Sequence, residues 1–303
     1  MSSSSPTLTS LDRDASIHPR VMMVTPDSRP AKGIRGLGSI FPFVFIVFFI
    51  ISPACRRAGD IATTLTVAGS TSVQPFAEKL AETYMAAHPG LAINVQGGGS
   101  TAGVRAAETG AAQIGMSSRH LKDSEAALHQ VTIALDGIAV IVNAANPVAG
   151  LSRAEVAAIF AGAIPRWGAV GGPDRPIHFV TREEGSGTRG AFEEMVMGKT
   201  EIAPRALVQD SNGAVREIVA SDPDALGYIS LGLVDRRVRA VAVDGVLPTH
   251  DTISAKRYAV VRPFLFLTRE EPAGATRGFI DYVLGPDGQR LLGLEGLIPV
   301  AQP

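Results

Sequence analysis

The sequence is poor in cysteine, in aromatic residues and in net charge. A single cysteine among 303 residues leaves no partner for a disulfide within the chain. Aromatic residues make up only 6%, which argues against a surface on which bases or sugars stack. The formal net charge is −1, and binding to nucleic acid usually needs a basic surface, so no nucleic-acid partner is expected. The chain is nevertheless 46% hydrophobic and long enough for two domains with cores of their own.

The chain also lacks a hydrophobic run that would cross a bilayer comfortably. Its most apolar stretch, Ser39–Ile51, is shorter than the ~20 residues that a spanning helix needs. We interpret residues 39–55 as a signal with a lipobox-like end, in which Cys55 resembles the lipidated cysteine of bacterial lipoproteins. A plain export signal or an uncleaved anchor, with Cys55 incidental, is the alternative. Residues 1–38, rich in Ser, Pro and Arg, are expected to be a disordered extension of an exported, periplasmic or cell-envelope protein.

Beyond a polar linker over residues 56–64, short apolar runs alternate with helical patterns, which indicates an α/β fold. Three of the apolar runs end in turns rich in Gly, Ser and Thr, and each of these turns leads into a helical pattern. The turns are Ala68–Val73, Gln96–Gly103 and Arg182–Arg189. Because all three have the same character, we expect them to converge on one ligand.

The third turn indicates what that ligand is. The first turn of a helix presents unpaired backbone N–H groups and the positive end of the helix dipole. Gly187 lets a ligand approach that backbone, and Ser186 and Thr188 add hydroxyl donors. Arg182 supplies a planar cation suited to an oxyanion, and an ordinary surface ion pair with Glu183 or Glu184 is the alternative. The turn therefore predicts a site for a small anion such as phosphate.

Enzymatic alternatives find less support in the sequence. Gly185–Gly190 matches the G-x-G-x-x-G pattern of dinucleotide-binding proteins, but a compact oxyanion suits its two hydroxyls and the adjacent arginine better. No Walker-type phosphate loop occurs, and Gly98–Ala102 fails the last position of the G-x-S-x-G nucleophile elbow. The six histidines are scattered, and no His or Cys spacing suggests a metal site. We expect a binding protein without cofactor or metal, with an enzyme acting on a phosphorylated substrate as the alternative.

Three further stretches rich in apolar residues are expected to be strands, and two of them bear on how the domains connect. Val131–Asn143 is expected to be a strand broken at Asp136 and Gly137, where the chain passes from one domain to the other. Val238–Val243 is expected to carry the chain back. The stretch Tyr258–Leu267 contains Pro263, which predicts an edge strand or a bent one.

The combined motifs resemble the phosphate-binding proteins of bacterial ABC transporters. They are, in chain order, AGSTSVQPF, GGGSTAG, IGMSSR, LDGIAVIVN, TREEGSGTRGAF, SNGAV and ALGYISLG. The resemblance implies a type II periplasmic-binding-protein fold, in which two α/β lobes of mixed sheet and flanking helices are joined by two crossing strands. Lobe I would comprise residues 65–138 and 239–303, and lobe II residues 139–238. Phosphate would be enclosed by hinge closure and delivered by a monomeric protein to a membrane permease driven by a separate ATPase.

The resemblance also implies ligand residues. Carried over motif by motif, these are Thr71, Ser72, Ser100, Arg182, Ser186, Gly187 and Thr188. Asp136 and Asn212 are further candidates for a position in the cleft. Gln113 stands where we expect the family to carry an aspartate, which accepts a hydrogen bond from the protonated oxygen of phosphate and repels fully ionised sulfate. An amide can accept a hydrogen bond but can also donate one. Another oxyanion, such as sulfate, tungstate or molybdate, is therefore the alternative ligand. We expect Gln113→Asp to sharpen the preference for phosphate over sulfate.

Overall fold

The computed structural model describes residues 63–300. The expectations for residues 1–38, for residues 39–55 with Cys55, and for most of the linker lie outside this part of the chain. The last two residues of the predicted linker already belong to the first strand, which begins at Thr63. Among residues 63–300, no helix is long and apolar enough to cross a membrane.

The first lobe begins with three parallel strands in the order β2-β1-β3. Helix α1 covers them with Phe76, Leu80 and Tyr84, which follow at intervals of four residues and lie on one buried face. The elements are β1 (Thr63–Gly69), α1 (Gln74–Ala87), β2 (Leu91–Gly97), α2 (Ser100–Thr109), β3 (Ile114–Ser117), a 3-10 turn (Asp123–Glu125), and the C-terminal α7 (Gly274–Leu284), α8 (Pro286–Leu294) and β12 (Ile298–Pro299).

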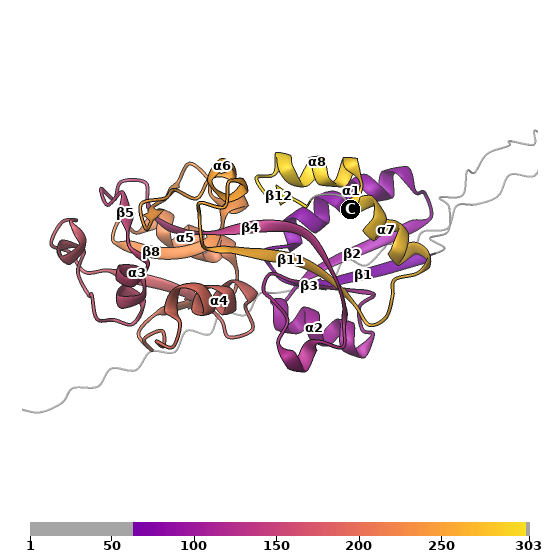
Figure 1. The fold of residues 1–303 in the computed structure, drawn as a ribbon, viewed down its shortest axis with the longest axis horizontal. Coiled ribbons are helices and arrows are strands. Elements are labelled where there is room, and N and C mark those ends of the chain that lie inside the picture. The colour runs from indigo at the N-terminus through magenta and orange to yellow at the C-terminus, as the bar shows by residue number, and fades with distance from the viewer. Residues whose placement is uncertain (1–62, 301–303) are drawn as a thin grey trace, which may run out of the picture. The chain divides into compact units, whose positions relative to one another are not determined.

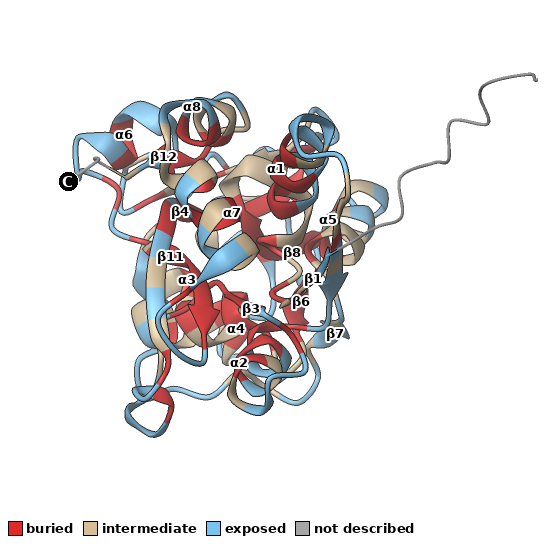
Figure 2. Ribbon diagram, turned by 90° about the vertical axis from the view of Figure 1, so that its right-hand side faces the viewer, coloured by how far each residue is buried: buried red, intermediate tan, exposed pale blue. Residues whose placement is uncertain are grey.

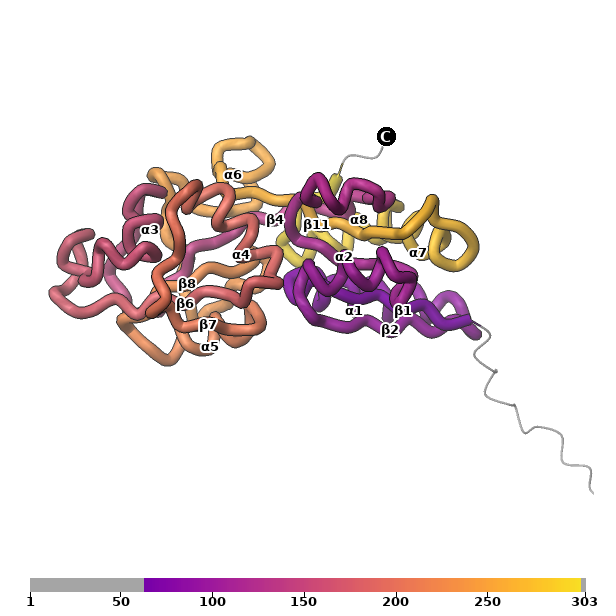
Figure 3. Tube along the Cα trace, turned by 90° about the horizontal axis from the view of Figure 1, so that it is seen from below, coloured from indigo at the N-terminus to yellow at the C-terminus, as the bar shows by residue number. Residues whose placement is uncertain are grey.

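Two long antiparallel strands, β4 (His129–Asn143) and β11 (Val261–Thr268), pass between the lobes (Figures 1 and 3). Strand β4 pairs with β11 along its first part and with β8 along its second. The predicted break at Asp136 and Gly137 is wrong, because β4 continues through both residues. Asp136 is instead the register partner of Arg262 on β11.

The second lobe adds β8, β6 and β7 to the far side of β4, so that pairing runs without interruption in the order β2-β1-β3-β11-β4-β8-β6-β7. Its elements are β5 (Gly150–Leu151), α3 (Arg153–Phe160), β6 (His178–Arg182), α4 (Gly187–Phe192), a π-helical turn (Glu193–Met197), β7 (Leu207–Gln209), α5 (Asn212–Ser221), β8 (Ala225–Ser230), β9 (Val238–Ala240), β10 (Ala242–Val243), α6 (His250–Ser254), and 3-10 turns at Trp167–Val170 and Leu231–Leu233.

Each lobe has its own hydrophobic core, and the buried residues concentrate on the strands and the inward helix faces (Figure 2). Phe76, Leu80 and Phe266 belong to the first core, whereas Trp167 and Phe192 belong to the second. The α/β fold in two lobes joined by two strands therefore agrees with the sequence prediction.

The return crossing differs from the prediction. Residues Val241, Val243, Tyr258 and Val260 pack in the second core, so the boundary expected at residue 239 does not hold. The strands predicted to cross there, β9 and β10, pair with β4 and β5, and the chain returns on β11. Pro263 does not place this strand at an edge, since β11 lies between β3 and β4, but the register shifts one residue later, at Phe264/Leu265.

Candidate functional site

The first and third glycine-containing turns meet where the two lobes adjoin. Ser72, on the turn after β1, and Thr188, in the first turn of α4, place their hydroxyl oxygens 2.7 Å apart. Arg182, at the end of β6, donates from Nη2 to Thr71 Oγ1 at 3.0 Å. Both bonds join residues of different lobes, because β1 and β6 run in opposite directions and each ends at the junction between the lobes.

The second turn joins the same cluster. The Thr101 N–H of α2 donates to the Gly185 carbonyl at 3.1 Å, and α2 and α4 face each other across the junction (Figure 3). Gly187 lies so close to α2 that a Cβ there would stand 2.1 Å from Ser100 Oγ. Glycine is required at this position by the approach of the opposite lobe. The structure therefore brings the three turns together.

Arg182 is the central cation of the cluster and is only 1% exposed, so it is not a surface residue. Its Nε and Nη2 donate to the two carboxylate oxygens of Glu183, each at 3.0 Å, and also to backbone carbonyls. Within the described chain, its Nη1 is buried without a hydrogen-bond partner. Leaving a buried donor unpaired costs about 1–3 kcal/mol, so this nitrogen calls for an acceptor.

Apart from the half-buried Thr71, the cluster is closed to solvent. Ser72, Ser100, Arg182, Ser186 and Thr188 are each at most 3% exposed. Hydrogen bonds to a charged group are stronger in such surroundings than in water, whereas an unmatched charge is costly there. A set of hydroxyl, amide and guanidinium donors enclosed in this way can hold a small anion by directed hydrogen bonds.

Asp136 and Asn212 also lie in this region. Asn212 donates from Nδ2 to Ser72 Oγ at 2.8 Å, so it contacts the cluster directly. Asp136 accepts from the Ser230 hydroxyl at 2.8 Å and from Arg262 Nη2 at 2.9 Å. Burial raises the pKa of the Asp136 carboxyl, and the charge of Arg262 opposes that rise. Asp136 is thus a buried partner of Arg262 on the crossing strands.

Sequence reasoning missed three residues of the cluster, namely Ser70, Ser118 and Arg262. Ser118 lies at the end of β3, where its N–H donates to Ser100 Oγ at 3.0 Å and its hydroxyl accepts from Ser70 at 2.8 Å. The signal for Ser118 was present, since Ser117, Ser118 and Arg119 follow a short apolar strand. Arg262 gave no such signal, because it stands within a hydrophobic strand.

Gln113 does not belong to the cluster. Its side chain is exposed, and its Oε1 accepts from the Thr66 N–H in the middle of β1 at 2.8 Å. The residue precedes β3, whereas the cluster gathers at the other end of that strand, at Ser118. The structure thus gives no reason for Gln113→Asp to change anion discrimination.

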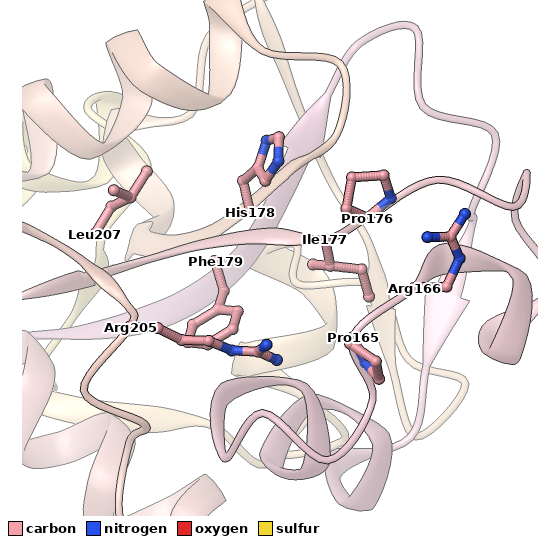
Figure 4. A pocket seen from close by; sticks show the side chains of 8 residues that line it. All are labelled: Pro165, Arg166, Pro176, Ile177, His178, Phe179, Arg205 and Leu207. Atoms are coloured by element: carbon pink, nitrogen blue, oxygen red, sulfur yellow. The ribbon is translucent and has the colours of Figure 1, made fainter. Parts of the chain in front are cut away.

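Other features of the described residues have different chemistry. A cavity of about 460 Å³ on the second lobe is lined by Pro165, Arg166, Pro176, Ile177, His178, Phe179, Arg205 and Leu207 (Figure 4). None of the predicted ligand residues lines it, and the Arg205 guanidinium lies over the Phe179 ring, 5.3 Å from its centroid. In residues 63–300, no group of three or more His, Cys, Asp or Glu side chains could hold a metal ion.

Comparison with known proteins agrees with this architecture. Residues 56–287 match the PBP superfamily domain, which defines the class of protein as a two-lobed binding protein. The phosphate-binding protein PstS of Bacillus subtilis is 31% identical over 281 residues, covering 86% of this chain and 93% of the relative. The chain therefore belongs to the family of the bacterial phosphate-binding proteins.

Solved structures show the same relationship. A substrate-binding protein from Clostridium perfringens, solved with bound phosphate, is 41% identical and superposes with a TM-score of 0.76 over 78% of this chain and all of that one. An ABC-type phosphate transport receptor from Vibrio cholerae is also 41% identical, with a TM-score of 0.68 and the same coverage.

Proposed function

We propose that this protein binds inorganic phosphate between its two lobes and delivers it to the permease of an ABC transporter. The observation that carries the proposal is the buried Nη1 of Arg182, which has no partner among residues 63–300 although every other donor of that guanidinium is engaged. An oxyanion oxygen would supply the missing acceptor. The relatives, which include a phosphate-binding protein and a phosphate transport receptor, support phosphate as the anion.

The ligand contacts would come from both lobes. Thr71, Ser72 and Ser100 would line the site from the first lobe, and Arg182, Ser186, Gly187 and Thr188 from the second. Because these residues lie on opposite sides of the junction, the anion would be enclosed when the lobes meet, and β4 and β11 would serve as the hinge. The proposed role needs no metal, cofactor or catalytic residue.

Another oxyanion, such as sulfate, remains a second candidate for a specific reason. The carboxylates of Glu183 and Asp136 are both engaged by arginines of the cluster. A phosphate that carries a proton would then donate a hydrogen bond to a hydroxyl oxygen instead of a free carboxylate. The hydroxyl oxygens of Ser100 and Ser118 lie in the cluster and can accept it. Sulfate carries no proton and would not need that acceptor.

We further propose that the protein is exported and held at the cell envelope through a lipid on Cys55, and that it acts as a monomer. Residues 56–62 would then tether the two-lobed part to the membrane surface. A variant with Cys55→Ser should be released into the soluble fraction of the envelope. Continued membrane association of that variant would contradict lipidation at Cys55.

Titration calorimetry on protein first stripped of bound anion tests the proposed function. We expect one-to-one binding of phosphate, with sulfate and tungstate weaker, and no conversion of sugar phosphates to products. Tight sulfate binding without phosphate binding would favour the second candidate. Product formation from a phosphorylated substrate would show an enzyme instead of a transport receptor.

A further inference from the structure

The Ser72 hydroxyl has a complete set of hydrogen-bond partners. Its oxygen lies 2.8 Å from Asn212 Nδ2, 3.2 Å from Arg262 Nη2 and 2.7 Å from Thr188 Oγ1. A hydroxyl can accept two hydrogen bonds and donate one. If both nitrogens donate, the acceptor capacity of Ser72 is used up, and its proton must go to the third partner.

Asn212 can only donate here, because its amide is held in one orientation. The backbone N–H of Ser230 donates to Asn212 Oδ1 at 3.2 Å, which turns the Nδ2 group toward Ser72. A flipped amide would set its carbonyl oxygen against Ser72 and its NH₂ group against another N–H. Asn212 and Ser230 are at most 1% exposed, so solvent would not compensate for the flip.

Arg262 can only donate as well, since a guanidinium has no acceptor. Its Nε and Nη2 are held by the Asp136 carboxylate at 3.0 and 2.9 Å, and its Nη1 donates to the Ser118 carbonyl at 3.1 Å. Asp136 is in turn held by the Ser230 hydroxyl. The five residues Ser72, Arg262, Asp136, Ser230 and Asn212 thus form a closed ring of hydrogen bonds.

We infer that Asn212 and Arg262 are positioning residues that fix the direction of the Ser72–Thr188 hydrogen bond. Ser72 donates to Thr188, and Thr188 is left with its own proton to donate to the anion. The anion oxygen that lies at Thr188 would therefore accept a hydrogen bond from it. The inference rests on the proposed function, because it needs an anion at Thr188.

A double-mutant cycle tests the inference on the full chain, with inorganic phosphate as the ligand in calorimetry. If Asn212 acts through Ser72, Asn212→Ala should weaken binding about fivefold or more in the parent protein but less than twofold in a Ser72→Ala background. Asn143→Ala is the matched control, because Asn143 also donates from a buried amide, to the Val219 carbonyl, but far from the cluster. The control should leave phosphate affinity unchanged.

Arg262 needs a paired variant, because its removal alone would leave Asp136 buried without a counter-ion. Arg262→Met combined with Asp136→Asn removes both charges together, and its effect on affinity should likewise disappear in the Ser72→Ala background. Circular dichroism establishes that each variant is folded. If Asn212→Ala does not fold, Asn212→Asp replaces it. Aspartate has the shape of asparagine, but its carboxylate would accept the Ser72 proton and so draw it away from Thr188. Asn212→Asp should therefore weaken binding more strongly when Ser72 is present than in the Ser72→Ala background.

The outcomes separate the two claims. Phosphate binding by the parent protein with non-additive losses would support the donor chain. Phosphate binding with losses that add in full would overturn the donor chain and leave the proposed function standing. Failure of the parent protein to bind any oxyanion would overturn the proposed function and the donor chain together.

Discussion

Adding one methyl group at Gly187 should weaken anion binding without weakening the fold. A Cβ at this position would lie 2.1 Å from Ser100 Oγ, 2.9 Å from Ser100 Cβ and 2.7 Å from Ser118 Oγ. Ser100 cannot simply rotate away, because its hydroxyl oxygen accepts the Ser118 N–H. Gly187 belongs to the second lobe and the two serines to the first, so the overlap exists only while the lobes are together.

The expected magnitude follows from the cost of overpacking. Forcing an extra methyl group into a filled interior typically costs about 1–3 kcal/mol. If this cost falls entirely on the closed state, Gly187→Ala should raise the dissociation constant of phosphate about 5- to 150-fold. The anion-free protein, in which we expect the lobes to separate, should keep its thermal midpoint.

Calorimetry and thermal unfolding of the anion-free protein measure the two effects. Gly185→Ala is the control, because its Cβ would meet only Thr101 Cβ across the same junction, at an ordinary contact distance of 3.9 Å, and should change affinity little. Unchanged phosphate affinity in Gly187→Ala would refute the reasoning. A lower thermal midpoint of the anion-free variant would also count against it, since it would place the overlap within the open state.

Three further predictions concern the cluster and the lobes. Arg182→Ala should weaken phosphate binding at least tenfold in calorimetry, because it removes the buried cation with the free donor, and near-unchanged affinity would reject its role. Hydrogen bonding to Arg119 lowers the pKa of Glu125 in the folded protein below its ordinary value of 4.5. The pair therefore stabilises the fold at pH values above 4.5, and this stabilisation is lost as the pH falls through the lowered pKa of the folded state. In urea unfolding, Glu125→Gln should cost about 1–3 kcal/mol at pH 6 and less at pH 3, and an equal cost at both would contradict this. Gly103→Ala should lower the anion-free thermal midpoint, because its Cβ would stand 2.4 Å from the Met116 carbonyl within one lobe, and an unchanged midpoint would refute this.

The parts of the site that depend on local sequence could be predicted. Each glycine turn lies between a strand and a helix, and the residues that cap helices and bind anions are the same small polar types. For this reason Ser72, Ser100 and Thr188 could be proposed from their neighbours alone. The first two turns could be expected to lie side by side, because turns after adjacent parallel strands share one edge of a sheet. The third turn follows β6 of the other lobe, and only the contact between the lobes brings it there.

The parts that depend on contacts between distant residues could not be predicted. Asp136 followed by Gly137 has the composition of a turn, yet the pairing of Asp136 with Arg262, 126 positions away, keeps β4 extended. Similarly, the motif predicts Gln113 as a ligand residue, but Gln113 precedes β3 and the cluster lies at the other end of that strand. The motif alone does not tell which end of this short strand faces the ligand. The return crossing was misplaced because β9 and β11 are both apolar, and only packing distinguishes them.

The distribution of charge explains how a nearly neutral protein could hold an anion in its interior. Both buried arginines of the cluster have a carboxylate of their own, Arg182 with Glu183 and Arg262 with Asp136. Because these charges cancel within the protein, the lobes can meet without a large unbalanced positive charge between them. Recognition then depends on the fixed direction of donors toward the anion, and not on an excess of positive charge. The ring around Ser72 is the clearest instance, since it orients a neutral hydroxyl by means of a charge pair that is already satisfied.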